Sequence, residues 1–122
     1  MMTEYDLTQR IREALAGAGN VREVKMFGGV GFMLNGHLVA AASKRGLLAR
    51  VGEGHQKEAL AARGAKLMEM RGRTMKDYIR LDPPALEEHT VATLLGLAVA
   101  FVKTLRAKAA RSTPTRRGRK TS

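Results

Sequence analysis

The sequence feature that most constrains the fold is the run of residues 22–36, where a double glycine precedes a short apolar segment that ends in Asn35-Gly36. An Asn-Gly pair between two apolar, alternating runs is a strong indication of a β-hairpin, because a type I′ turn requires positive φ at both central residues. The pattern therefore predicts strands at residues 30–34 and 37–43, joined by this turn.

Helical spacing of apolar residues predicts a first helix at residues 3–18, with Leu7, Ile11 and Leu15 on one stripe. Thr3 and Asp6 have the spacing of a capping box at its start. Asp82-Pro83-Pro84 predicts the beginning of the last helix, because aspartate caps helices and proline suits their first turn. Between these helices we expect a strand at 47–51, a short helix at 54–63, and two strands at 67–71 and 77–81.

These predictions give the order α-βββ-α-ββ-α, an α+β fold in which helices pack against an antiparallel sheet. The length of 122 residues suits one domain. We assign residues 1–109 to this domain and residues 110–122 to a basic, disordered tail, because the tail has no apolar residue able to anchor it.

The net charge of +11 is unevenly distributed along the chain. Eight basic residues and no acidic residue follow residue 102, so removing their charge leaves +3 on residues 1–102. The folded part is therefore only mildly basic, and the charge is concentrated at the C-terminal end.

The segment Val24-Lys25-Met26-Phe27-Gly28-Gly29-Val30-Gly31-Phe32 resembles the N-terminal domain of the TfoX/Sxy competence-regulator family. Further similarity lies in Leu47-Leu48-Ala49-Arg50-Val51, Met75-Lys76-Asp77-Tyr78 and Asp82-Pro83, and the resemblance covers roughly residues 5–106. The residues that carry the family motif are Lys25, Met26, Phe27, Gly28, Gly29, Gly31, Lys76 and Tyr78.

The resemblance implies an α-βββ-α-ββ-α domain similar to secretion-chaperone-like architectures. Full-length members of the family carry a second, helical domain and are associated with transcriptional activation of competence genes. In this sequence a short basic segment follows the last predicted helix. The resemblance supplies no catalytic residues.

The segment Gly28-Gly29-Val30-Gly31 has two interpretations. Glycine-rich turns can offer backbone N–H groups to a phosphate. However, the spacing matches neither GxGxxG nor a Walker A loop, and no helix is predicted after it. We favour a structural role, in which the glycines allow positive φ or close approach of the backbone at the entry to a strand.

No group of residues predicts catalysis, a metal or a cofactor. His37, His55 and His89 are scattered, cysteine is absent, and a zinc site needs at least three ligands in register. We interpret the three histidines as partly exposed residues without a metal. No serine lies in a nucleophile elbow, and Glu87 and Glu88 suit the N-terminal end of a helix. We therefore expect a non-enzymatic protein.

The basic residues give the sharpest functional hypothesis. The tail could contact nucleic acid without sequence preference, through salt-sensitive phosphate contacts, and Arg71, Arg73, Lys76 and Arg80 could extend this patch. The alternative interpretation is a solubilising end, because no aromatic residue lies among the charges to stack on bases. The tail residues proposed for contact are Arg111, Arg116, Arg117, Arg119 and Lys120.

Two classes of function follow. The first is a regulatory or accessory protein that binds a macromolecule, helped by the tail. The second is a homodimeric or protein-binding module that uses a sheet face and the Met-rich segment 66–75, with no role for nucleic acid. We expect no membrane partner, because no apolar anchor accompanies the charges, and we expect a cytoplasmic protein.

Overall fold

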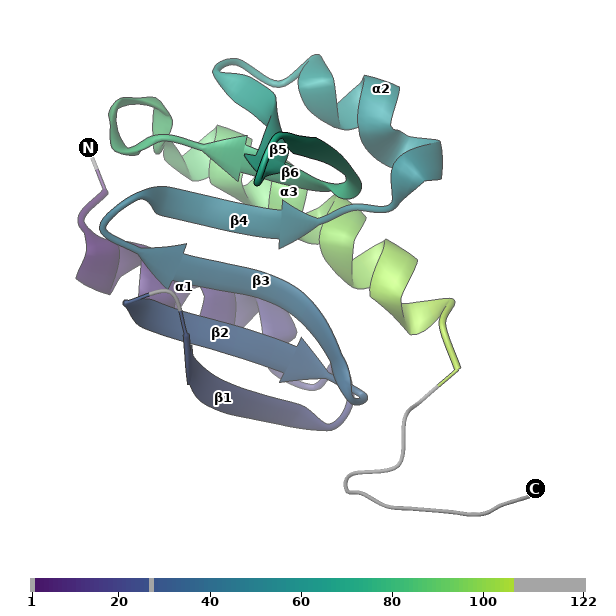
Figure 1. The fold of residues 1–122 in the computed structure, drawn as a ribbon. Coiled ribbons are helices and arrows are strands. Elements are labelled where there is room, and N and C mark those ends of the chain that lie inside the picture. The colour runs from purple at the N-terminus through teal and green to yellow at the C-terminus, as the bar shows by residue number, and fades with distance from the viewer. Residues whose placement is uncertain (1, 27, 107–122) are drawn as a thin grey trace.

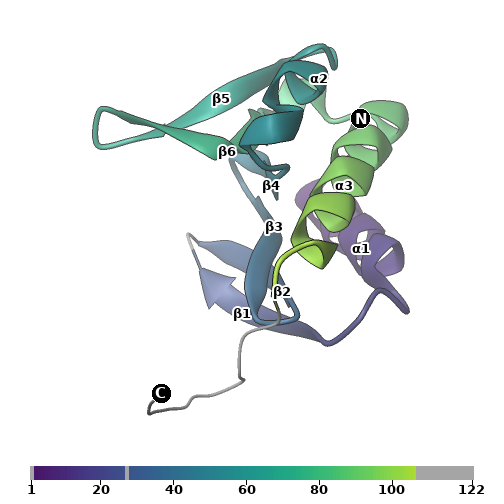
Figure 2. The same ribbon diagram turned by 90° about the vertical axis from the view of Figure 1, so that its right-hand side faces the viewer.

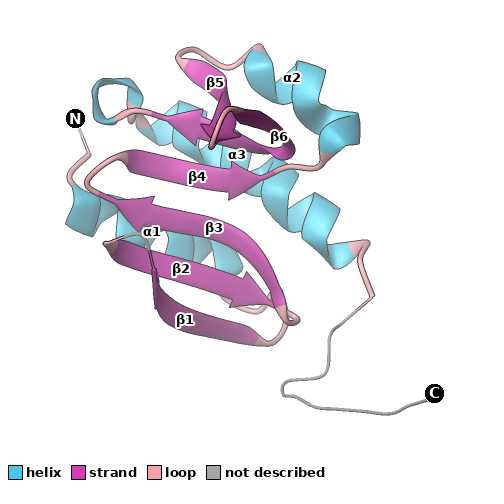
Figure 3. Ribbon diagram, in the orientation of Figure 1, coloured by secondary structure: helices cyan, strands magenta, loops and turns pink. Residues whose placement is uncertain are grey.

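The computed structural model describes residues 2–26 and 28–106 of the chain (Figure 1). Within these residues, a first helix is followed by four strands, a short helix, two more strands and a last helix, coloured by type in Figure 3. The helices are α1 (Glu4–Leu15), α2 (Gln56–Leu60) and α3 (Glu88–Lys103), with 3₁₀ turns η1 (Glu53–His55) and η2 (Pro83–Ala85). The strands are β1 (Val21–Met26), β2 (Gly29–Leu34), β3 (His37–Ser43), β4 (Gly46–Arg50), β5 (Ala65–Met70) and β6 (Arg73–Leu81).

The six strands form one antiparallel sheet with the order β1-β2-β3-β4-β6-β5. The first four strands are a meander, and the β5–β6 hairpin joins it through β6, which pairs with β4. The predicted α+β class is confirmed, and the predicted elements occur in the predicted order. The sheet also contains β1, a strand that the sequence analysis did not predict.

Strand β1 forms an edge of the sheet and pairs only with β2 among the described strands. Its residues are mostly exposed, so it has no strong alternation of buried and exposed positions. Arg12 of α1 donates two hydrogen bonds to the carboxylate of Glu23, at 2.7 and 2.8 Å. This pairing links the edge strand to the helix layer and lowers the pKa of Glu23.

Helices α1 and α3 cover one face of the sheet, as Figure 2 shows from the side. The core lies between these two helices and the sheet. It contains Phe32 on β2, Leu47 on β4 and Ile79 on β6, each almost fully buried. Helix α3 contributes a stripe of buried apolar residues to this core: Val91, Leu94, Leu95, Ala98 and Val102. The two-layer packing therefore uses one face of the sheet.

The ends of the helices follow local chemistry. Thr3 caps α1 and forms the predicted capping box with Asp6. The helix ends at Leu15, before the predicted residue 18, and Gly17 lies soon afterwards at φ +77°. The Asp82-Pro83-Pro84 segment begins the short turn η2 instead of α3, which starts at Glu88 with Glu87 as its N-cap.

Two turns with the same geometry shape the hairpins. Asn35 and Gly36 both have positive φ, +54° and +86°, as a type I′ turn requires, which confirms the predicted hairpin. Arg71 and Gly72 also have positive φ, +54° and +78°. This second tight turn joins β5 to β6, so β6 starts at Arg73, before the predicted residue 77, whereas β5 runs from Ala65 to Met70.

Candidate binding surface on the open face of the sheet

The face of the sheet opposite α1 and α3 has no helix across it within the described residues (Figure 2). We call it the outer face. Strand register places Met33 beside Leu38, and Ala41 beside Leu48. Since the core residues of β4 are Leu47 and Ala49, alternation puts Leu48 on the outer face. Both faces of the central strands are therefore apolar.

The β5–β6 hairpin bends away from the sheet partway along its length. The register of β5 and β6 shifts between Leu67, which pairs with Ile79, and Met68, which pairs with Met75. Three residues of β6, 76–78, therefore have no paired partner on β5. Such a bulge bends a strand pair, and Figure 2 shows the far half of the hairpin projecting on the outer side. We call residues 68–75 the arm.

Asp77 lies at this bulge and holds it against the end of β4. Its backbone carbonyl accepts hydrogen bonds from the N–H groups of Val51 and Gly52, at 2.8 and 3.0 Å. Its carboxylate accepts a hydrogen bond from the N–H of Glu53 at 3.2 Å and pairs with Arg50 at 3.4 Å. One residue of the Met75-Lys76-Asp77-Tyr78 segment thus fixes where the arm begins.

Arg50 and Tyr78, which pair across β4 and β6, complete this junction. The Arg50 guanidinium carbon lies 5.8 Å from the centre of the Tyr78 ring and 5.7 Å from that of Phe101 on α3. Gly52 makes room for Phe101, because a Cβ at Gly52 would overlap the ring. Burial raises the pKa of the Tyr78 hydroxyl. Tyr78 therefore has a structural place in the fold.

The glycines of the motif at β1 and β2 also have structural roles. Gly28 has φ +74°, in the turn between the two strands. A Cβ at Gly29 would overlap the carbonyl oxygen of Ala42 on β3, and a Cβ at Gly31 would overlap the side chain of Met26. This agrees with the structural interpretation of the glycine-rich segment. Lys25 is exposed on β1, and Phe27 lies outside the described residues.

A hollow of about 300 Å³ lies between the arm and the β3–β4 hairpin. We call it the arm hollow. Apolar residues line it from both sides, with Ala41, Leu47 and Leu48 from the sheet and Met68 and Met70 from the arm. Met70 is 38% exposed, although it is a large apolar residue.

Charged side chains also line the arm hollow. Three of them are arginines, Arg45, Arg71 and Arg80, and one is an acid, Glu69. Within residues 2–26 and 28–106, Arg45 and Arg71 have no ion-pair partner. The net charge around the hollow is therefore positive.

Arg80 has a different environment from the other two arginines. Its guanidinium donates to the carboxylate of Asp82 at 3.1 Å, and Lys66 donates to the same carboxylate at 2.6 Å. The hydrogen bond from Lys66, together with Arg80, lowers the pKa of Asp82. Asp82 thus bridges two neighbouring cations, because Lys66 and Arg80 pair across β5 and β6.

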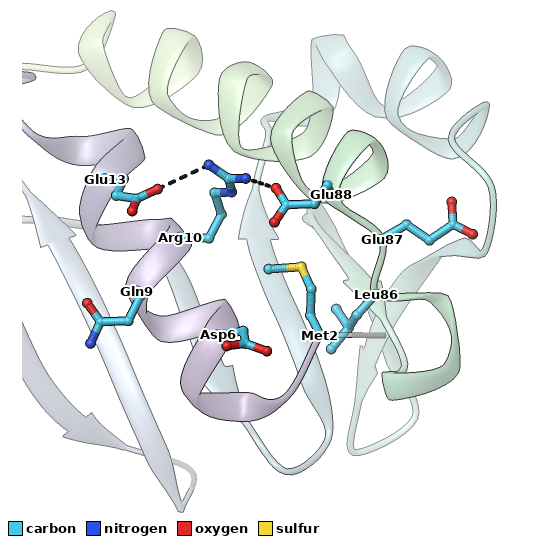
Figure 4. A pocket seen from close by; sticks show the side chains of 8 residues that line it. All are labelled: Met2, Asp6, Gln9, Arg10, Glu13, Leu86, Glu87 and Glu88. Atoms are coloured by element: carbon cyan, nitrogen blue, oxygen red, sulfur yellow. Dashed lines mark hydrogen bonds and ion pairs between the residues drawn. The ribbon is translucent and has the colours of Figure 1, made fainter.

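A second hollow, of about 600 Å³, lies where α1 faces the start of α3 (Figure 4). Arg10 extends from α1 between two carboxylates, pairing with Glu13 at 3.1 Å and with Glu88. These contacts tie the two helices together, so the charged groups have a structural explanation. Among the described residues, no cluster of histidine, aspartate or glutamate could hold a metal ion.

The histidines lie apart from both hollows. Nε2 of His37 lies 2.6 Å from the carbonyl oxygen of Arg106, and Nδ1 of His55 lies 2.9 Å from that of Val51. The expectation of three partly exposed histidines is wrong for His37, which is buried with 8% exposure. Its place opposite Leu34 at the edge of the core explains this burial.

The remaining predicted site residues are dispersed. Arg71, Arg73 and Lys76 lie on or next to the arm and are exposed. Arg45 and Leu48 were not predicted from the sequence as members of a surface. The indication available for Leu48 was the unbroken apolar run of β4, since a strand with apolar residues on both faces has an apolar outer face. The tail residues Arg111, Arg116, Arg117, Arg119 and Lys120 lie outside the described residues.

Comparison with known proteins gives one match. A family model described as the TfoX N-terminal domain matches residues 13–102, which is most of the chain and includes every described strand. Searches of curated proteins and of solved structures found no match. Within the described residues, no helix has the length and apolar character needed to cross a bilayer.

Proposed function

Because the chain belongs to the TfoX N-terminal domain family, we propose that it is a small, non-enzymatic regulatory or accessory protein that works in the cytoplasm by binding macromolecules. The single observation that supports this most is the outer face, which combines apolar side chains, the arm hollow and a surplus of positive charge. A surface of this kind suits contact with a partner.

The proposal assigns two contacts to the chain. The outer face contacts a protein partner. The basic C-terminal segment contacts nucleic acid through phosphates, because Arg111, Arg116, Arg117, Arg119 and Lys120 bring five positive charges and no acidic residue. Contacts of this type give affinity without sequence preference, and they weaken steeply as salt rises.

Fluorescence anisotropy of a labelled random duplex tests the nucleic-acid contact. The titration compares the full chain with a version truncated after Ala109, at about 50 and 200 mM salt. With five phosphate contacts, we expect the affinity of the full chain to fall about 10²- to 10³-fold between the two salt concentrations. Loss of binding on truncation supports the tail contact, and equal binding by both versions contradicts it.

A second candidate function is a homodimeric protein-interaction module with no nucleic-acid role. The half-buried apolar side chains Met33 and Leu38 on the outer face favour it, because a second copy could cover them. Sedimentation velocity over a wide concentration range distinguishes the two. A monomer at all concentrations contradicts the homodimer, and a concentration-dependent dimer together with no duplex binding contradicts the first proposal.

A further inference from the structure

We infer that the arm hollow binds an acidic segment of a partner protein, with one bulky apolar side chain of that segment inserted between Leu48 and the methionines of the arm. This inference rests on the proposed function, because it names the class of protein that the outer face would bind. Three features of the hollow support the inference: the apolar side chains at its base (the floor), the charged side chains at its edge (the rim) and its volume. The charge of the rest of the chain also supports it.

The floor of the hollow suits an apolar side chain of variable shape. Leu48 and Ala41 come from the sheet, and Met68 and Met70 reach in from the arm. Methionine is unbranched and polarisable, so it adapts to different apolar groups. Covering Met70, which is 38% exposed, would also remove apolar surface from water.

The rim of the hollow favours carboxylates. Arg45 and Arg71 lie on its two sides, the first in the β3–β4 turn and the second in the turn of the arm. Within the described residues neither has an ion-pair partner, so each guanidinium is available for a carboxylate. Glu69 is the one acid that lines the hollow, and it favours a segment whose acidic residues lie toward the two arginines.

The size of the hollow limits what it can hold. A volume of about 300 Å³ is at the lower end for a ligand site, for which the usual range is about 300–1,000 Å³. It has room for one large side chain and part of its backbone, but not for a packed helix or a folded domain. An apolar residue between acidic neighbours matches these dimensions.

The rest of this chain is poorly suited to fill the hollow. The segment after residue 106 is basic and without acids, so its charge has the same sign as the rim. A second copy carries the same net charge of +11. Nucleic acid would match the charge, but no aromatic side chain lines the hollow for a base to stack on. An acidic protein segment satisfies both the charge and the apolar floor.

The test is selection of peptides on the immobilised full chain, from a displayed random library of about twelve residues at about 150 mM salt. We expect enriched peptides that place acidic residues on both sides of a bulky apolar one. Labelled synthetic copies are then titrated against the full chain and three full-length variants. Leu48→Glu alters the floor, Arg45→Glu alters the exposed rim, and Val21→Glu is the matched control, an exposed apolar residue on the edge strand β1 outside the hollow.

We expect Leu48→Glu and Arg45→Glu each to weaken peptide binding at least about tenfold, and Val21→Glu to change it less than about twofold. Arg45 is exposed in a turn, so its substitution remains informative if Leu48→Glu does not fold. Enrichment of basic peptides, no enrichment, or equal losses in all three variants would overturn the inference. If peptides fail while the duplex titration succeeds, this inference alone is wrong; failure of both removes the proposed function as well.

Discussion

Arg50 on β4 and Asp77 on β6 are joined across the sheet at the point where the arm begins, with Nη2 of the arginine 3.4 Å from Oδ2 of the aspartate. The same carboxylate accepts the backbone N–H of Glu53, so one side chain connects two strands and the turn that follows β4. This contact lies at the bend of the arm, where residues 76–78 of β6 have no paired partner on β5.

Replacing this carboxylate should destabilise the domain. Asp77→Ala leaves the N–H of Glu53 and the guanidinium of Arg50 without their acceptor, and we expect the free energy of unfolding to fall by about 1–3 kcal/mol. Urea denaturation measures this change. Glu58→Ala on the exposed side of α2 is the matched control, with an expected change within about 0.5 kcal/mol. Equal effects of the two substitutions would contradict the structural role of Asp77.

The glycines near the start of the sheet should differ sharply in their tolerance of a methyl group. At Gly29 a Cβ would overlap the backbone of Ala42, which cannot move without disturbing β3, and we expect Gly29→Ala to cost more than about 2 kcal/mol.

Two other glycines provide the comparison. At Gly31 the obstacle is the flexible side chain of Met26, so Gly31→Ala should cost less than Gly29→Ala. At Gly54 a Cβ meets nothing within 4 Å, and Gly54→Ala should be nearly neutral. Thermal and urea unfolding of the three variants gives the order. A Gly29→Ala variant as stable as Gly54→Ala would contradict the close approach of β2 and β3.

The hydroxyl of Tyr78 should ionise at a higher pH than an ordinary tyrosine. Tyr5 is 70% exposed, whereas burial raises the pKa of Tyr78 above the ordinary value of about 10. Absorbance at alkaline pH follows Tyr78 alone in a Tyr5→Phe variant. Because the unfolded chain loses this proton first, stability should fall as pH rises above about 10. A Tyr78 that titrates at the ordinary value in the folded protein would contradict its burial against Arg50.

The carboxylate of Asp82 should respond to the removal of Lys66. Its pKa is lowered by the hydrogen bond from Lys66 and by Arg80, so Lys66→Met should move it back toward the ordinary value. The stability that this carboxylate contributes is present above the ordinary aspartate pKa of about 3.9 and is lost as pH falls below it. Side-chain NMR titration measures the shift, and an unchanged pKa in the variant would show that Lys66 does not contact Asp82 in solution.

Much of the fold follows from local sequence chemistry. The Asn35-Gly36 turn, the capping box at Thr3 and the apolar stripe of α3 each depend on residues close together in the chain, and all three appear in the structure. Strand β1 is different, because an exposed edge strand with alternating charges has no buried face to produce a pattern.

The candidate site was only partly predictable. The sequence indicated a Met-rich segment at 66–75, and this segment contains the whole arm, residues 68–75. Its position over Leu48 depends on the bulge held by Asp77, and the partners of Asp77 are about 25 residues away in the chain. No local pattern encodes contacts at that separation. The Asp82-Pro83-Pro84 segment was also only partly informative. Its residues are typical of a helix start, but they begin the short turn η2 and not α3.

A duplex titration of two full-length variants at about 50 mM salt tests most directly whether the chain binds through two separate surfaces. In one variant the five tail residues Arg111, Arg116, Arg117, Arg119 and Lys120 become serine, and in the other Leu48 becomes glutamate. We predict a loss of duplex affinity of at least about 10²-fold in the tail variant and less than about twofold in Leu48→Glu. Unchanged binding by the tail variant, or an equal loss in Leu48→Glu, would contradict the separation of a nucleic-acid contact from a protein contact.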